Sequence, residues 1–157
     1  MSIKLVRLDD RLIHGQVVVG WGNAISAELI LLIDDQVAAN DWERELYAVG
    51  VPPEIDVEFC SVADSAAALG RCANSDNRTM VLVGDVETLV KTCNESDAVR
   101  RVNIGGVHER DDRSKRLAYV FLTNKEAAAL KSLSDRGIEV TARDVPTTKP
   151  VPLAEFA

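Results

Sequence analysis

The sequence predicts an α/β fold in which an open, mainly parallel central sheet of about seven strands carries helices on both faces. Strand-like apolar segments alternate with helix-like segments along all 157 residues, without internal repeats or linkers. Residues 28–33 (ELILLI) form a continuous apolar run, as expected for a strand covered on both faces. Because 46% of the residues are hydrophobic, we expect residues 1–157 to bury one core and form one domain.

The first half of the chain accounts for four strands and three helices. Residues 3–8 are short and apolar, and Asp9 and Asp10 end this first strand. The next helix is expected to begin near His14, because apolar residues recur every three or four positions after it. Asn40 and Ser61 are suited to cap the two helices that follow them. The remaining strands of this half are expected at residues 28–33, 55–60 and 79–83.

The second half continues the alternation. A helical stripe runs from Val86 to Cys93, and Thr123 with Glu126 predicts a capping box for a later helix that stops at Gly137. The prolines between Pro146 and Pro152 are expected to lead to the terminus. Strands are expected at residues 101–104, 117–122 and 138–143.

Composition excludes several classes of function. The chain has 25 Asp and Glu against 18 Lys and Arg, a net charge of -7, which argues against a nucleic-acid partner. No apolar run approaches the roughly eighteen residues that span a bilayer, and no signal peptide is evident, so we expect a cytoplasmic protein. Three cysteines without a CxxC pattern predict neither a disulfide framework nor a zinc site.

The candidate site lies where the first strand ends. In open parallel sheets, ligands bind beyond the carboxyl ends of the strands. We therefore expect residues 9–14 to share one edge with residues 34–35, 84–85 and 103–108. His108 is close enough in this arrangement to take part, although a solvated loop histidine is the simpler reading.

The residues expected at this edge are of the types that bind an anion. A histidine at the start of a helix should be neutral and nucleophilic, and the planar Arg11 side chain suits phosphoryl oxygens. Asp9 or Asp10 can accept a hydrogen bond from the other nitrogen of the His14 ring. Gly15 removes a side chain beside His14. A surface histidine near a structural Arg–Asp pair would explain the same residues without catalysis.

Residues 8–17 (LDDRLIHGQV), followed by Trp21, resemble the active-site signature of the IIB subunit of the mannose/fructose/sorbose family of bacterial phosphotransferase systems. Residues 37–38 (VA), 103–106 (NIGG) and 136–140 (RGIEV) recur in the order found in that family. The resemblance covers essentially the whole chain.

The resemblance implies a phosphocarrier, a protein-N(pi)-phosphohistidine–sugar phosphotransferase. His14 would take a phosphoryl group from a phosphorylated IIA protein and pass it to a sugar held by the IIC and IID membrane subunits. Arg11 would stabilise phosphoryl charge and Asp10 would act in orientation. No metal or cofactor is implied, and the chain would associate peripherally with its membrane subunits. The glycines expected to contact phosphate are Gly15, Gly84, Gly105 and Gly106.

Two other functions would use some of the same residues. A receiver-like signalling domain would need an acceptor aspartate after the third strand, where the chain has Phe59, Cys60 and Ser61. The second alternative is a IIB-like regulatory phosphoprotein that is phosphorylated on His14 but not coupled to transport, and the sequence does not distinguish it from a transport component. The identity of the sugar and the formation of a homo-oligomer are also left open by the sequence.

Overall fold

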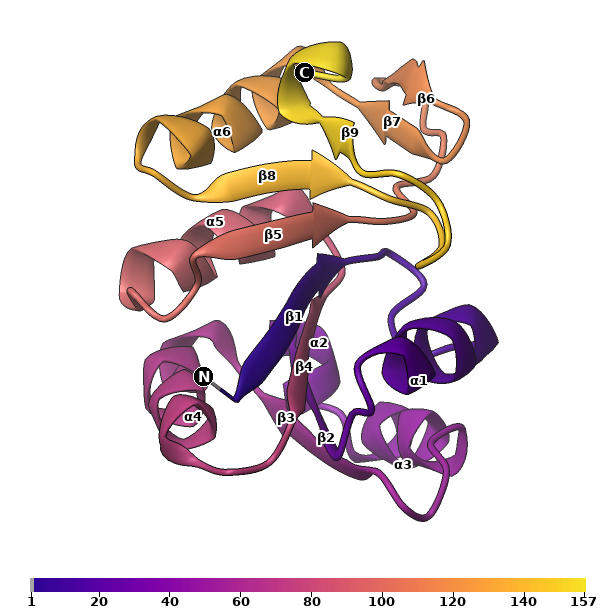
Figure 1. The fold of residues 1–157 in the computed structure, drawn as a ribbon, viewed down its shortest axis with the longest axis vertical. Coiled ribbons are helices and arrows are strands. Elements are labelled where there is room, and N and C mark those ends of the chain that lie inside the picture. The colour runs from indigo at the N-terminus through magenta and orange to yellow at the C-terminus, as the bar shows by residue number, and fades with distance from the viewer. Residues whose placement is uncertain (1) are drawn as a thin grey trace.

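The computed structural model describes residues 2–157 and confirms the α/β fold with a seven-stranded, mainly parallel sheet. The strand order is β3-β2-β4-β1-β5-β8-β9, and each pairing is parallel except that of β8 with β9 (Figure 1). The strands of this sheet are β1 (Ile3–Leu8), β2 (Leu29–Ile33), β3 (Asp56–Cys60), β4 (Thr79–Val83), β5 (Arg101–Ile104), β8 (Glu139–Ala142) and β9 (Val151–Pro152).

The helices form largely where caps were expected. Asn40, Ser61 and Thr123 each accept a hydrogen bond from a backbone N–H of the first turn, and Glu126 completes the capping box. A short helix capped by Asp34 was not expected. The helices are η1 (Gln16–Trp21), α1 (Gly22–Ala24), α2 (Asp35–Ala38), α3 (Asp41–Val49), α4 (Val62–Asn74), α5 (Val86–Glu95), α6 (Asn124–Asp135) and η2 (Leu153–Glu155). Within residues 2–157, no helix combines the length and apolar character needed to cross a bilayer.

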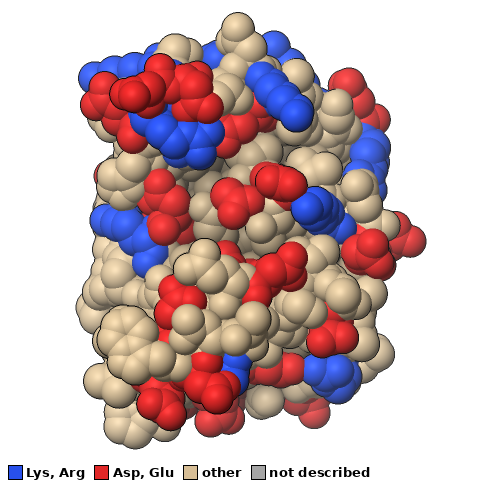
Figure 2. Space-filling view, turned by 180° about the vertical axis from the view of Figure 1, so that it is seen from behind, with Lys and Arg blue, Asp and Glu red and all other residues tan. Residues whose placement is uncertain are grey.

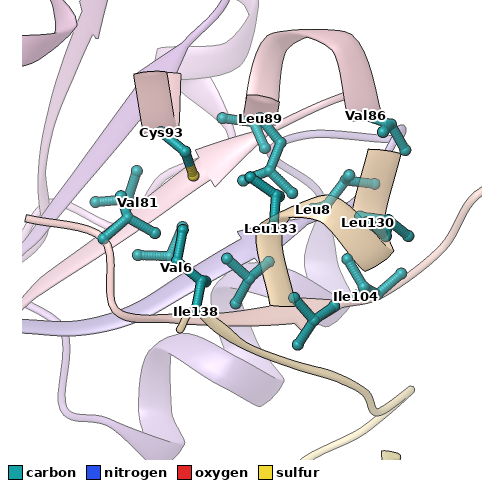
Figure 3. Close-up of a cluster of buried hydrophobic side chains, with 14 of the residues drawn as sticks. Val6, Leu8, Val81, Val86, Leu89, Cys93, Ile104, Leu130, Leu133 and Ile138 are labelled. Atoms are coloured by element: carbon teal, nitrogen blue, oxygen red, sulfur yellow. The ribbon is translucent and has the colours of Figure 1, made fainter. Parts of the chain in front are cut away.

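Two apolar clusters divide the core between the faces of the sheet. On one face, α4, α5 and α6 pack against side chains that include Val6, Leu8 and Ile104 (Figure 3). The other cluster joins η1 and α3 to Ile30 and Leu82. On β5 and β8, however, every second residue is polar and at least partly exposed, so this second face is covered over only part of its width.

The expected strand over residues 117–122 is wrong. Residues 114–122 instead form a hairpin of β6 (Ser114–Leu117) and β7 (Val120–Leu122) outside the main sheet. The hairpin is held by Val107, whose N–H donates to Tyr119 O and whose carbonyl accepts from Phe121 N, both at 2.9 Å. These contacts satisfy the backbone of β7 beyond the carboxyl end of β5. The last place in the main sheet is taken by β9, from the segment expected only to lead to the terminus.

The helix after β1 begins close to His14 as expected, but its first turns are wide. Residues 16–21 form a π-helix, and Val17 and Trp21 are buried on its inner side. The Val18 N–H donates to His14 O at 3.0 Å, so the histidine backbone adjoins the first turn. Short π-helical segments are frequent at functional sites.

Candidate active site

A tight turn after β1 builds the site. The backbone N–H of Asp9 donates to Val83 O, that of Asp10 to Gly106 O, and that of Leu12 to Asp9 O, at 2.9–3.0 Å. Leu12 has a φ of 58°, a left-handed conformation that is strained for a branched side chain. Because this turn is bonded to β4 and to the loop after β5, it returns the chain toward the sheet and places His14 beside Asp9.

Asp9 is the centre of the site, and it is fully buried. Its Oδ1 atom lies 3.2 Å from Arg11 Nε and 3.5 Å from His14 Nε2. Its Oδ2 atom accepts hydrogen bonds from the Nη2 atoms of Arg7 and Arg11, each at 3.3 Å. Burial raises the pKa of Asp9, but the hydrogen bond from Arg11 and the charge of Arg7 outweigh it, so the pKa is below its usual value. Asp9 is therefore an ionised carboxylate between two guanidinium groups.

Arg7 begins the charged stretch in which the sequence predicted the site, but its role as a buried cation was not predicted. Its Nη1 atom donates to the side-chain oxygen of Asn103 and to Arg143 O, and its Nη2 atom donates to Asp144 O at 3.1 Å. The guanidinium also lies 4.7 Å from the centre of the Trp21 ring. Burial lowers the pKa of Arg7, while Asp9 opposes the shift. An arginine inside the apolar strand sequence IKLVRL was the signal for this role.

His14 presents one ring nitrogen inward. Its Nε2 atom is buried and faces Asp9, whereas the side chain as a whole keeps 19% of its exposure. Burial lowers the pKa of His14, Asp9 opposes this, and the charge of Arg11 adds to the lowering. Burial is the largest cause of the lowered pKa, and the neutral form of the ring is therefore favoured near pH 7. With Nε2 turned toward Asp9, Nδ1 is the ring nitrogen left for chemistry.

Asp10 lies in the same turn but contacts a different histidine. Its Oδ2 atom accepts a hydrogen bond from the backbone N–H of His108 at 2.7 Å, and its Oδ1 atom lies 2.5 Å from His108 Nδ1. The His108 side chain is 63% exposed, and its carbonyl accepts from Arg113 Nη1 at 3.0 Å. Asp10 thus connects the turn to the loop after β5, while Asp9 is the carboxylate that faces His14.

Three of the four glycines make room for side chains of the site. A Cβ on Gly105 would lie 2.3 Å from Arg7 Nη2, one on Gly106 would lie 3.3 Å from Asp9 Oδ1, and one on Gly84 would lie 3.0 Å from Leu12 Cδ2. The Gly105 N–H already donates to Leu8 O at 2.7 Å. Gly15 differs, because a Cβ there would meet open space.

Replacing Gly105 by Ala should lower the free energy of unfolding by about 1–3 kcal/mol, because the added methyl group displaces a buried guanidinium. Gly15→Ala is the matched control, since its backbone is right-handed helical and its surroundings are empty. Urea denaturation of both variants measures the difference. Equal midpoints for the two variants would contradict the close approach of Gly105 to Arg7.

Comparisons with known proteins identify the family of the chain. Residues 3–157 match the model of a family described as the PTS system sorbose subfamily IIB component. The chain belongs to this family. The resemblance read from residues 8–17 and the fold it implied are therefore confirmed. IIB components of this type are phosphotransferases in sugar uptake, and this assigns the IIB chain to the same class of enzyme.

The relatives of the chain are named for different sugars. It is 26% identical over 147 residues to the fructose-specific EIIB component of Bacillus subtilis, covering 94% of this chain and 90% of that one. It is 33% identical to the mannose-specific EIIAB component of Escherichia coli K12, covering 94% of this chain and 46% of that one. The IIBSor domain of the Klebsiella pneumoniae sorbose permease superimposes with a TM-score of 0.90 at 26% identity, covering 99% and 96% of the two chains.

Proposed function

We propose that residues 1–157 act as one phosphocarrier domain in which His14 accepts a phosphoryl group from a phosphorylated IIA partner. The group then passes to a sugar during uptake through IIC and IID membrane subunits. The observation that carries the proposal is the neutral His14 ring, with Nε2 facing the buried Asp9 and Nδ1 left for attack. A IIA partner is supported by the mannose-specific relative, whose name joins IIA and IIB in one protein.

Each transfer step forms one bond to phosphorus and breaks another, and neither step requires a metal ion. The Nδ1 lone pair of His14 attacks phosphorus, and the phosphorus–nitrogen bond of the donor phosphohistidine breaks, leaving its electron pair on the donor ring. In the second step a sugar hydroxyl oxygen attacks, the phosphorus–Nδ1 bond breaks, and the hydroxyl proton leaves to a base or to water. Throughout, a proton on Nε2 faces the Asp9 carboxylate, which stabilises the phosphorylated ring.

Arg11 is the residue proposed to stabilise the phosphoryl charge. Its guanidinium is held by both Asp9 oxygens and by Gln16 Oε1 at 3.0 Å, yet its side chain remains 38% exposed. A planar cation fixed on one side and open on the other can meet phosphoryl oxygens without reorganising. Gly15 leaves the space beside His14 free for the approaching group.

The chemistry of the phosphoryl linkage tests the proposal. The protein is incubated with phosphoenolpyruvate, the general phosphotransferase proteins and a IIA partner, and the label is then exposed to acid and to base. A phosphohistidine is lost in acid and survives base, whereas the acyl phosphate of an aspartate is lost in both, and NMR of the labelled protein should place phosphorus on Nδ1. A label released by base would indicate a phosphoaspartate and overturn the assignment.

Replacing Arg11 by Lys should slow transfer from phospho-IIA by about 10–100-fold, because lysine keeps the charge but loses the planar fork. The free energy of unfolding should change little, since the side chain is partly exposed. Rapid-quench measurement of the transfer rate checks this, with Arg110→Lys as the control in an exposed pair with Asp112. Equal rates for both variants and the parent chain would refute the role of Arg11.

The titration of His14 should follow the direction of its pKa shift. Burial lowers this pKa below its usual value of 6.5, so the ring should stay neutral until the pH falls below that value. NMR of the imidazole carbon-bound protons between pH 4 and 8, roughly the range around the usual pKa, measures the midpoint directly. A midpoint above 6.5 would contradict the described environment.

A further inference from the structure

The half of the second sheet face that helices leave uncovered carries a groove of about 580 Å³. In Figure 1, α1 lies beside the carboxyl end of β1 and does not extend over β5 and β8. The rungs of the sheet place Asn103 next to Thr141 and Arg101 next to Glu139. These residues line the groove together with apolar residues that include Leu5 and Trp21, whereas the opposite face of the same strands is apolar.

The groove is basic, although the chain as a whole is acidic. Lys4, Arg100, Arg101 and Arg143 line it together with one acidic residue, Glu139, whereas the net charge of the chain is -7. Acidic side chains are spread over the face shown in Figure 2. Within residues 2–157, the one ion pair that these four cations make is that of Arg101 Nε with Glu139 Oε2, at 2.9 Å. The other three cations are free to attract an anion.

The cations have an uneven distribution along the groove. Lys4, Arg100 and Arg101 lie at the amino ends of β1 and β5, whereas Arg143 follows β8 at the other end. The Arg143 guanidinium lies 6.0 Å from the centre of the Trp21 ring, and its Nε atom is buried without a hydrogen-bond partner in the described residues. One end of the groove therefore carries three cations, and the other carries Arg143.

We propose that this groove binds a small organic phosphate. Its phosphate group lies against Lys4, Arg100 and Arg101, because guanidinium and ammonium groups bind phosphate oxygens with charge-assisted hydrogen bonds. Its hydroxylated body extends over Asn103 and Thr141 toward Arg143. The volume falls within the range of about 300–1,000 Å³ that is typical of small-molecule sites. An acidic protein segment would instead favour cations spaced along the whole groove.

This groove does not include His14 or Arg11, but three of its lining residues contact Arg7, which donates to Asp9. The Asn103 side-chain oxygen and the Arg143 carbonyl accept hydrogen bonds from Arg7, and the Trp21 ring lies 4.7 Å from its guanidinium. The groove residues Lys4, Arg100 and Arg101 contact neither His14 nor Arg11 in any hydrogen bond or ion pair of residues 2–157. The proposal therefore holds or fails independently of the phosphocarrier function.

NMR titration of the full, unphosphorylated chain tests the proposal, with glucose 6-phosphate as the probe. We expect saturable shifts of backbone amides at residues 4–5, 100–103 and 139–141. The double substitution Arg100→Gln and Arg101→Gln should weaken binding at least about tenfold, since it removes two cations that would donate charge-assisted hydrogen bonds to the phosphate. The matched control removes two exposed lysines of α6, Lys125→Gln with Lys131→Gln, and should leave the affinity unchanged.

Three further probes distinguish binding of a sugar phosphate from binding of a sugar, of a simple anion and of an acidic peptide. Glucose alone and inorganic phosphate alone should each bind more weakly than glucose 6-phosphate, and a short acidic peptide should not displace it. Inorganic phosphate that binds as tightly as glucose 6-phosphate would reduce the groove to a simple anion site and overturn the proposal. Shifts confined to residues around Arg11 and His14, tighter binding of the peptide, or equal affinities of the two double variants would also overturn it.

Discussion

The His14→Ala variant should carry no acid-labile phosphoryl label after incubation with phosphoenolpyruvate, the general phosphotransferase proteins and a IIA partner. The loss should be complete rather than partial, because the substitution removes the nucleophile itself. Arg11 and Asp9 would remain, but neither can form a phosphohistidine. Gel separation of radiolabelled protein, followed by acid treatment, measures the result.

The second histidine provides the control for this experiment. His108 is exposed and bonded to Asp10, whereas His14 faces Asp9. The His108→Ala variant should therefore keep its label at the parent level. A label that persists in His14→Ala, or that disappears only in His108→Ala, would assign the phosphoryl group to another residue.

Replacing Asp9 by Asn should lower the free energy of unfolding by about 3–5 kcal/mol, the typical cost of leaving buried cations without their counter-ion. Arg7 is fully buried and Arg11 shares the same carboxylate, so two guanidinium groups lose their partner together. Transfer to His14 should slow as well, because Nε2 loses the anion it faces and the pKa of His14 falls further. Urea denaturation and the rapid-quench assay measure the two effects.

Asp10→Asn is the matched control for the Asp9 substitution. The Asp10 side chain keeps 23% exposure and its partner His108 is exposed, so a loss of about 1 kcal/mol or less is expected. The stability supplied by ionised Asp9 should be present above the usual pKa of an aspartate and lost as the pH falls through its lowered folded-state pKa. If Asp9→Asn and Asp10→Asn had equal stabilities, the assignment of Asp9 as the centre of the site would fail.

Local patterns predicted much of the fold. The caps at Asn40, Ser61 and Thr123 were recognisable because each depends on a side chain and a backbone N–H only three residues away. The hairpin of β6 and β7 was not recognisable, because its place is decided by backbone hydrogen bonds to Val107. The π-helical turns after Gly15 could not be predicted from the spacing of apolar residues either. Val17 and Trp21 would face the core in an α-helix as well as in a π-helix.

The sequence by itself determined that a histidine and an arginine follow the first strand of a parallel sheet, and the motif around them determined the family. Only the tertiary structure decided which charged groups meet. Asp9 and Asp10 are neighbours of the same type, yet one turns inward to Arg7, Arg11 and His14 while the other turns to His108. That division depends on the left-handed turn at Leu12 and on backbone hydrogen bonds to β4 and to the loop after β5, whose residues lie more than seventy positions away in the chain. A buried carboxylate is stable only where such distant segments supply its counter-ions and donors, so no local pattern could separate the two.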